Sequence, residues 1–369
     1  MEVANQPHIR FPNIWNNRFF ELNSLAEPLI ESLAFKRLDK TTFLGILSPK
    51  FHSHVRSPLY VDINKDNSKE KKDSYLNKDD GTRKDHSMDV AILFLDMVSS
   101  LGLKESTYKY AVAWGLVHDI ATWPLSHTGE AAFSELLGIS GKKLRTQMIL
   151  GDKSLPSDLS VRSALSEIGV IPNKLLELFD KEPTGISKDL IPLWEIVHSP
   201  LTPDSLEGIW RSGRVLGIDV PTPDKVINAI SKSLFGTIVS KSSSSSVLDF
   251  WRRKSELYKK TINRPCIIRL ESSWSFALEK YYRDSSLLDT LHFSESEIVN
   301  ELSTRGIPSS NSIKRYKHPL IYYVEPSRKK KFDSDQPLLS LRDVLRKKIM
   351  KESGIKWNQQ NEFLLKGQG

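Results

Sequence analysis

The sequence contains one cysteine, Cys266, among its 369 residues. A single cysteine excludes an intrachain disulfide framework and a zinc site made of cysteines, and it fits the reducing cytoplasm in which we expect the protein to work. No uninterrupted apolar stretch approaches the roughly 20 residues of a membrane-spanning helix, so we expect no membrane partner. The opening residues, MEVANQPHIRFP, do not join a basic segment to an apolar one, and we expect no secretory signal.

Apolar residues and positive charge are both plentiful. Hydrophobic residues make up 39% of the sequence and include 8 Trp, enough for a sizeable core in one large or two ordinary domains. The formal net charge of +8 fits either solvated Lys and Arg faces or attraction to phosphate-bearing ligands such as nucleotides and nucleic acid. Basic residues cluster at 252–254, 259–260, 328–331 and 346–348, but clustering does not distinguish a small phosphorylated molecule from a polymer.

The spacing of apolar residues predicts a mostly α protein. Apolar side chains recur at helical intervals over 86–100 and 107–119, and the same spacing predicts helices at 31–47 and 224–240. The segment 318–325, HPLIYYVE, is the best strand candidate, so we expect a small C-terminal α+β portion beside the helical core.

Composition divides the chain into three regions. We predict an N-terminal arm at 1–30, a helical metal-binding domain at 31–240, and a region at 241–369 that completes the core and could form an oligomer interface. Within the second region, 62–82 is charged and almost free of aliphatic residues, which is typical of a mobile surface insertion. The alternative is a lid over a site, since the segment ends just before His86.

The stretch 114–130, WGLVHDIATWPLSHTGE, is the most informative part of the sequence. An apolar run leads into the adjacent pair His118 and Asp119, and Pro124 follows. We interpret this as a buried helix that presents an imidazole and a carboxylate side by side at its C-terminal end. These ligand types suit a divalent cation such as Mn²⁺, Fe²⁺, Co²⁺, Ni²⁺, Zn²⁺ or Mg²⁺.

Four side chains could together hold such an ion: His86, His118, Asp119 and Asp204. His86 begins one predicted helix and the His-Asp pair ends the next, so antiparallel packing would bring the two ends together. Asp204 follows a proline at an expected helix start. Two imidazoles and two carboxylates leave open positions on a six-coordinate ion for water or a phosphate oxygen. Taken singly, His86 has a simpler interpretation as a cap or surface residue, and Asp204 as an N-cap.

Three sequence blocks resemble the HD-domain phosphohydrolases, and more closely their deoxynucleoside triphosphate triphosphohydrolase branch. They are RKDHSMDVA (83–91), AWGLVHDIATWPLSHTGE (113–130) and TPDSLEGIWRSGRVLGI (202–218). The resemblance also covers FKRLDKTTFLG (35–45) and LDFWRRKSELYKKTINRP (248–265), so it spans roughly 30 to 290 in family order. It implies an HD-domain helical core and a homo-oligomer with nucleotide sites, including effector sites, between subunits.

The resemblance also assigns roles to individual positions. It makes His86, His118, Asp119 and Asp204 the metal ligands, and His127 and Glu130 the groups that assist the attacking water and the leaving group. Arg83 matches an arginine that contacts phosphate, and Arg211 matches the arginine of the third block, for which a structural salt bridge is an equal alternative. Arg253, with its neighbours Arg252 and Lys254, could contact phosphate or simply form a solvated helix face.

The sequence departs from the family pattern in two respects, the catalytic histidines and the sugar pocket. The His expected two residues before the proline is Thr122, and no His occurs in 131–160, where the family has a further catalytic one. The positions that shape the sugar pocket of deoxynucleotide hydrolases are Phe43, Gly208 and Ser212 instead of Gln, Tyr and Asp. The metal site therefore looks intact, whereas the substrate pocket looks rebuilt.

These observations leave three hypotheses about function. The first is a metal-dependent phosphohydrolase acting on a nucleotide, for example a deoxynucleoside triphosphate from which triphosphate is released. The second is a phosphodiesterase or nuclease acting on nucleic acid or a cyclic nucleotide, which the basic clusters favour. The third is a nucleotide-sensing module without turnover, which Thr122 and the missing second His favour.

Overall fold

The computed structural model describes residues 22, 25–49, 79–180, 185–199, 201–228, 230–233, 236–239, 244–258, 261, 265–282 and 287–305. This part of the chain is mostly helical, which confirms the predicted fold class. The strand predicted at 318–325 lies outside the described residues, as do most of the predicted N-terminal arm at 1–30 and most of the predicted insertion at 62–82.

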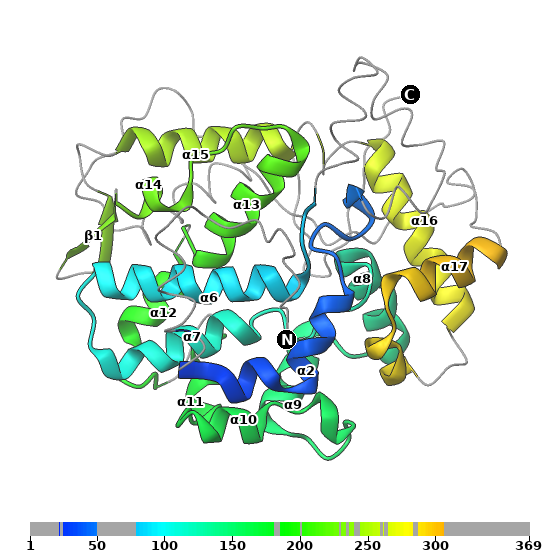
Figure 1. Ribbon diagram of the computed structural model, residues 1–369, viewed down its shortest axis with the longest axis horizontal. Coiled ribbons are helices and arrows are strands. Elements are labelled where there is room, and N and C mark those ends of the chain that lie inside the picture. The colour runs from blue at the N-terminus through cyan, green and yellow to red at the C-terminus, as the bar shows by residue number, and fades with distance from the viewer. Residues whose placement is uncertain are drawn as a thin grey trace, which may run out of the picture.

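Figure 1 shows the order of the elements. The α-helices are α2 (Leu33–Lys36), α6 (Arg83–Ser100), α7 (Tyr108–Val117), α8 (Ser126–Leu137), α9 (Gly141–Leu150), α10 (Arg162–Glu167), α11 (Pro172–Glu177), α12 (Ile191–Val197), α13 (Pro203–Leu216), α14 (Pro223–Ile227), α15 (Ser244–Leu257), α16 (Pro265–Tyr282) and α17 (Glu295–Arg305). Short 3₁₀ turns are η1 (Arg37–Lys40), η2 (Gly45–Leu47), η3 (Glu105–Thr107), η4 (Ser157–Leu159) and η7 (Leu287–His292), and the strands are β1 (Ile230–Ser233) and β2 (Gly236–Val239).

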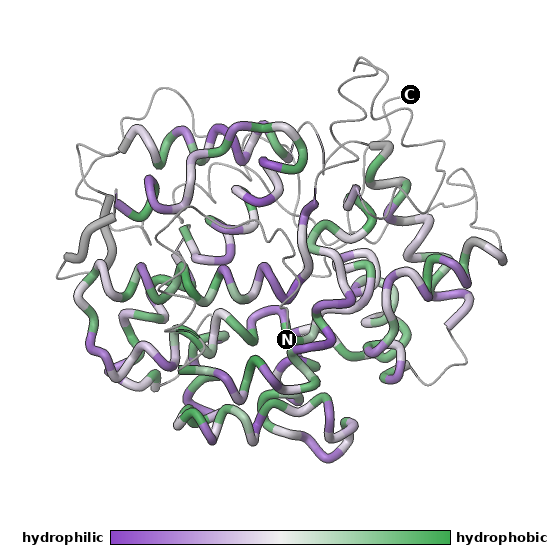
Figure 2. Tube along the Cα trace, in the orientation of Figure 1, coloured by the Kyte–Doolittle hydropathy of each residue, from purple (hydrophilic) through white to green (hydrophobic). Residues whose placement is uncertain are grey.

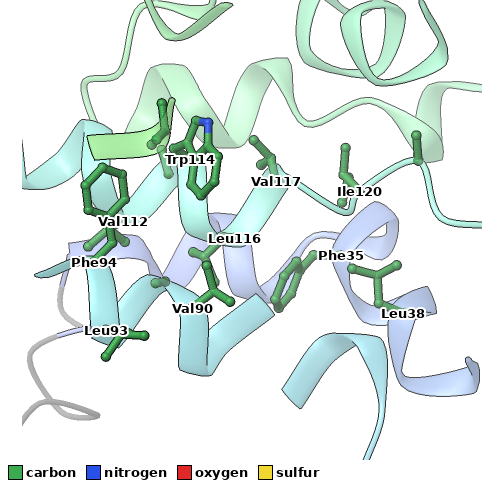
Figure 3. Packing of buried hydrophobic residues seen from close by; sticks show 14 of the residues in the cluster. Phe35, Leu38, Val90, Leu93, Phe94, Val112, Trp114, Leu116, Val117 and Ile120 are labelled. Atoms are coloured by element: carbon green, nitrogen blue, oxygen red, sulfur yellow. The ribbon is translucent and has the colours of Figure 1, made fainter. Parts of the chain in front are cut away.

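Helices α6 and α7 form the centre of the fold. Every residue of α7 from Tyr110 to Val117 is buried, as expected for a helix that is apolar on all sides. A side chain on Gly115 would collide with the backbone of Ala91, so this glycine lets the two helices approach closely. Figure 3 shows Val90 and Leu93 of α6 packed among residues of α7 and α2. On the other side, α13 lies along α6 and is covered by α15 (Figure 1).

The surrounding helices bury one face each. Figure 2 shows hydrophobic and hydrophilic residues alternating along most of them. None of the helices in the described part of the chain combines the length and the apolar character needed to cross a bilayer.

Helix α6 begins three residues earlier than the sequence indicated. Thr82 accepts a hydrogen bond from the backbone of Asp85, whose carboxylate accepts one from the backbone of Thr82, which makes a capping box. Just before it, the buried carboxylate of Asp80 accepts hydrogen bonds from Leu44 N and Ser48 Oγ. The end of the predicted insertion at 62–82 is therefore tied to the fold, and His86 lies in the first turn of α6.

Two predicted helices are wrong in part. The segment 31–47 contains short helical pieces separated at Thr41, whose backbone is extended (φ −117°, ψ 121°), instead of one helix. The segment 224–240 forms α14 and then an antiparallel hairpin in which Ile230 pairs with Val239. The consecutive β-branched residues of β2 favour extended backbone, which the helical spacing of apolar residues concealed.

Glu295, the first residue of α17, joins this C-terminal helix to the loops around the centre. Its buried carboxylate accepts hydrogen bonds from Thr42 Oγ1 (2.7 Å) and from the backbone of Leu125 (2.9 Å). Burial raises the pKa of Glu295 to about 7, the hydrogen bonds from Thr42 and Leu125 oppose the rise, and the Asp80 carboxylate adds to it.

We predict that Glu295→Gln alters the pH dependence of stability. The folded-state pKa of about 7 exceeds the ordinary value of 4.5, so the wild type loses stability as pH rises from about 4.5 to about 7. The glutamine variant lacks this loss, and the difference in unfolding free energy between the two proteins should change by about 2–3 kcal/mol from pH 5 to pH 8. Denaturant unfolding at both pH values measures it.

The matched control is Glu297→Gln. Glu297 lies in the same helical turn but is exposed and bonded to Ser294. Parallel pH profiles for the wild type and the Glu295 variant would contradict the prediction.

Candidate metal centre

The four predicted ligands converge from three helices. His86 comes from the first turn of α6, His118 and Asp119 follow the end of α7, and Asp204 lies in the first turn of α13. The two imidazole Nε2 atoms are 3.2 Å apart. Asp204 Oδ1 lies 3.2 Å from Nε2 of His86 and 3.7 Å from Nε2 of His118. Asp119 Oδ2 lies 3.9 Å and 3.7 Å from the same two atoms.

The hydrogen bonds of the other ring nitrogens fix the tautomers. His118 Nδ1 lies 2.7 Å from the carbonyl oxygen of Gly115, which can only accept, so this nitrogen carries the proton. His86 Nδ1 donates to the carboxylate of Glu207. Burial disfavours charge on Glu207, but Arg211 and His86 outweigh burial and lower its pKa, so it is an ionised acceptor. Both Nε2 atoms therefore point toward each other, and either can offer a lone pair to a cation once it carries no proton.

Two imidazole nitrogens and two carboxylate oxygens close together favour a positive charge between them. Burial opposes protonation of His86, but the Glu207 and Asp204 carboxylates prevail and raise its pKa to about 9. Ligand atoms about 2.1 Å from one ion and about 90–110° apart are about 3.0–3.4 Å from each other. The observed separations of 3.2–3.9 Å come close to this range. His86, His118 and Asp119 have ligand atoms within 4.8 Å of one another and fit a divalent ion, and Asp204 lies close to both imidazoles. The Asp204 side chain is 50% exposed, which leaves the centre open on that side.

A buried chain of charges supports His86 from behind. Arg211 donates from Nε to Glu207 (2.6 Å), from Nη2 to Asp89 (2.6 Å) and from Nη1 to the carbonyl of Asp80 (3.0 Å). All three guanidinium nitrogens are thus engaged inside the protein. The structure therefore favours the salt-bridge alternative for Arg211 over a phosphate contact.

Arg83 and Arg37 hold the chain around Asp119. Arg83 donates from Nη1 to Asp119 Oδ2 (2.7 Å) and from Nε to Ser126 Oγ (3.1 Å). Burial disfavours charge on Asp119, but His118 and Arg83 hold its pKa well below the usual range. Arg37 donates to the carbonyl of Ile120 and, at 2.8 Å, to that of Thr122. Arg83 is thus a support for Asp119 as well as a candidate phosphate contact.

His127 and Glu130 form a half-exposed pair beside the ligands. His127 Nδ1 lies 3.7 Å from Glu130 Oε2, and the two side chains are 51% and 42% exposed. His127 lowers the pKa of Glu130 against the effect of burial, and the charges of Asp119 and Arg83 also act on this carboxylate. The pair therefore lies near the metal ligands with access to solvent.

Arg253 is not brought to the ligands by any contact in the described residues. It pairs within its own helix, with Asp249 (3.7 Å) and Glu256 (3.1 Å), and Arg252 is exposed. Lys254 is the basic residue of this cluster that approaches the centre, because its Nζ donates to Ser205 Oγ (2.8 Å), next to Asp204.

Sequence reasoning missed Glu207 and Arg145 and left Lys254 undecided. Glu207 lies three residues after Asp204 on α13, a spacing that places both on one helix face and could have revealed it. Arg145 and Lys254 reach the site from helices far away in the sequence, and no local pattern distinguishes them from surface cations.

Two of the positions that depart from the predicted motif, Phe43 and Gly208, lie against each other beside His86. The ring of Phe43 lies 4.6 Å from that of His86, and a Cβ on Gly208 would be only 3.3 Å from Phe43 Cζ. Ser212 bonds back to the carbonyl of Gly208 within α13 (2.7 Å). An apolar ring therefore occupies the space between Gly208 and His86.

Comparison with known proteins identifies the fold and no function. No family model and no curated protein matches the chain. Among solved structures, the chain is similar to the crystal structure of a hypothetical protein from Aquifex aeolicus, with a TM-score of 0.55 and 18% sequence identity. The match covers 76% of this chain and 68% of that chain. At this identity the likeness shows a shared fold alone.

We predict that Glu207→Gln weakens metal binding. The carboxylate orients His86 and makes its Nε2 a better ligand, and loss of such a partner typically costs 10–100-fold in affinity. Titration calorimetry with Mn²⁺ measures the change, and thermal melting checks that the variant is folded.

Asp89→Asn is the matched control, because Asp89 also pairs with Arg211 but is not bonded to His86. It should change Mn²⁺ affinity by no more than a few-fold. Equal losses in both variants would mean that Glu207 acts only through the buried salt bridge.

Proposed function

We propose that the protein is an HD-type, metal-dependent phosphohydrolase that acts on a nucleotide, similar to the deoxynucleoside triphosphate triphosphohydrolases. The observation that carries the proposal is the cluster of His86, His118 and Asp119, with the half-exposed Asp204 close to both imidazoles. The three blocks that contain these residues occur in the family's order, which supports the same conclusion.

The charges around the centre suit a phosphate. Arg83 and Lys254 lie beside Asp119 and Ser205, on two sides of the ligand cluster. A bound divalent cation would polarise the phosphorus–oxygen bond and acidify a bound water. Arg83 keeps the Asp119 carboxylate ionised and in place, while the cationic side chains offset the charge of an incoming phosphate.

His127 and Glu130 supply proton transfer in this proposal. Glu130 is ionised because His127 lowers its pKa, so its carboxylate can take a proton from the attacking water. His127 is half-exposed and can donate a proton to the leaving oxygen. This division of roles places the base and the acid on adjacent turns of α8.

The residues beside the centre do not specify the base or the sugar of the substrate. Phe43 and Gly208 lack the polar groups with which the resembled family holds the sugar. A substrate search must therefore include ribonucleotides, cyclic nucleotides and oligonucleotides as well as deoxynucleoside triphosphates.

We predict that the purified full chain loaded with Mn²⁺ or Co²⁺ hydrolyses at least one nucleotide. Chromatography of the products separates triphosphate release from stepwise loss of phosphate. His118→Ala and Asp119→Ala should each lower turnover at least 100-fold, because each removes a metal ligand. His292→Ala should not, since His292 lies away from the centre and pairs with Asp158.

The other outcomes select the alternatives. Salt-dependent cleavage of nucleic acid would favour a phosphodiesterase or nuclease. Nucleotide-induced stabilisation without hydrolysis, across Mn²⁺, Co²⁺, Fe²⁺ and Mg²⁺, would favour a sensing module and contradict the proposal.

A further inference from the structure

One face of α9 lies over the candidate catalytic pair. A side chain on Gly141, the first residue of α9, would collide with the carboxylate of Glu130. Arg145 lies one turn further along the same helix face. Its Nη1 donates to the backbone carbonyl of His118 (2.9 Å). Arg145 thus extends from the neighbourhood of Glu130 to that of the metal ligands.

The guanidinium of Arg145 is held by stacking. Its central carbon lies 4.3 Å from the centroid of Phe179, and Phe179 stacks on Trp114 at 5.7 Å. Trp114 in turn stacks on His118 at 5.4 Å, with the rings inclined by 15°. Together with the bond to the His118 carbonyl, these contacts fix the plane of the guanidinium relative to a metal ligand.

Arg145 is not neutralised by these contacts. A carbonyl and an aromatic face leave its positive charge without a paired carboxylate, and its Nε is buried with no acceptor among the described residues. Burial lowers its pKa, and the carboxylates of Asp119 and Glu130 oppose that effect, so both act on the guanidinium from nearby. A buried donor without an acceptor costs free energy unless a ligand supplies one.

Arg145 also lies within 131–160, the segment that contains no His. A guanidinium offers fixed charge and several N–H donors, but it does not give up a proton near neutral pH. We propose that Arg145 is a phosphate-binding residue, and that its guanidinium stabilises the negative charge of a polyphosphate bound beside the metal ligands. This inference rests on the proposed function and names a residue of the same site.

The test uses inorganic triphosphate as the probe and the full chain saturated with Mn²⁺. Titration calorimetry should show that Arg145→Gln binds triphosphate about 10–100-fold more weakly than the wild type, the loss expected for hydrogen bonds to a charged group. Affinity for Mn²⁺ alone should stay within about two-fold. Arg162→Gln is the matched control, because Arg162 also donates to a backbone carbonyl, that of Leu150, but is exposed on α10.

Arg145→Lys is the second variant, to be measured if the glutamine variant does not fold. An ammonium cannot keep the His118 carbonyl and still present a forked donor to phosphate, so binding should fall at least several-fold. Unchanged triphosphate binding in either folded variant would overturn the inference, and so would an equal loss of Mn²⁺ affinity, which would make Arg145 a support for His118. Failure of the wild type to bind triphosphate would instead remove the proposed function, and the inference with it.

Discussion

Two imidazole Nε2 atoms face each other across 3.2 Å in the middle of the protein, and the surrounding structure is arranged around that contact. The opposite side of each ring is held by a hydrogen bond, to Glu207 for His86 and to the Gly115 carbonyl for His118. With the Asp119 and Asp204 carboxylates beside them, the two nitrogens favour a positive charge between them. The close packing of α6 on α7 therefore brings the two rings together as a prepared binding site.

The parts that hold this site come from distant regions of the chain. Arg37, near the start of the described residues, fixes the carbonyls that follow Asp119. Glu295, near their end, holds the backbone of Leu125, which has positive φ (64°) together with Ser126 (52°). Non-glycine residues adopt this conformation only when their surroundings enforce it. The helix α17 is thus part of the same structural unit as the candidate metal ligands.

Sequence reasoning succeeded where one local property determined the structure. The run before His118 is apolar on all sides, so it could be recognised as a buried helix, and antiparallel packing then brought His86 to the same place. It failed where contacts between distant segments determined the structure. The segment 31–47 is broken at Thr41 because the backbone there pairs with residues 81–83. The segment 224–240 forms a hairpin despite helical spacing. Arg145 was missed because its role depends on a helix face visible only after folding.

The pairing of Phe43 with Gly208 links two positions that are 165 residues apart in the sequence, 43 and 208. A Cβ at 208 would press on the phenyl ring, which would have to shift by a few tenths of an ångström, and a smaller residue at 43 would leave a void against His86. The effect of a substitution at either position therefore depends on the residue at the other, and any engineered change of the space beside His86 has to consider both residues together.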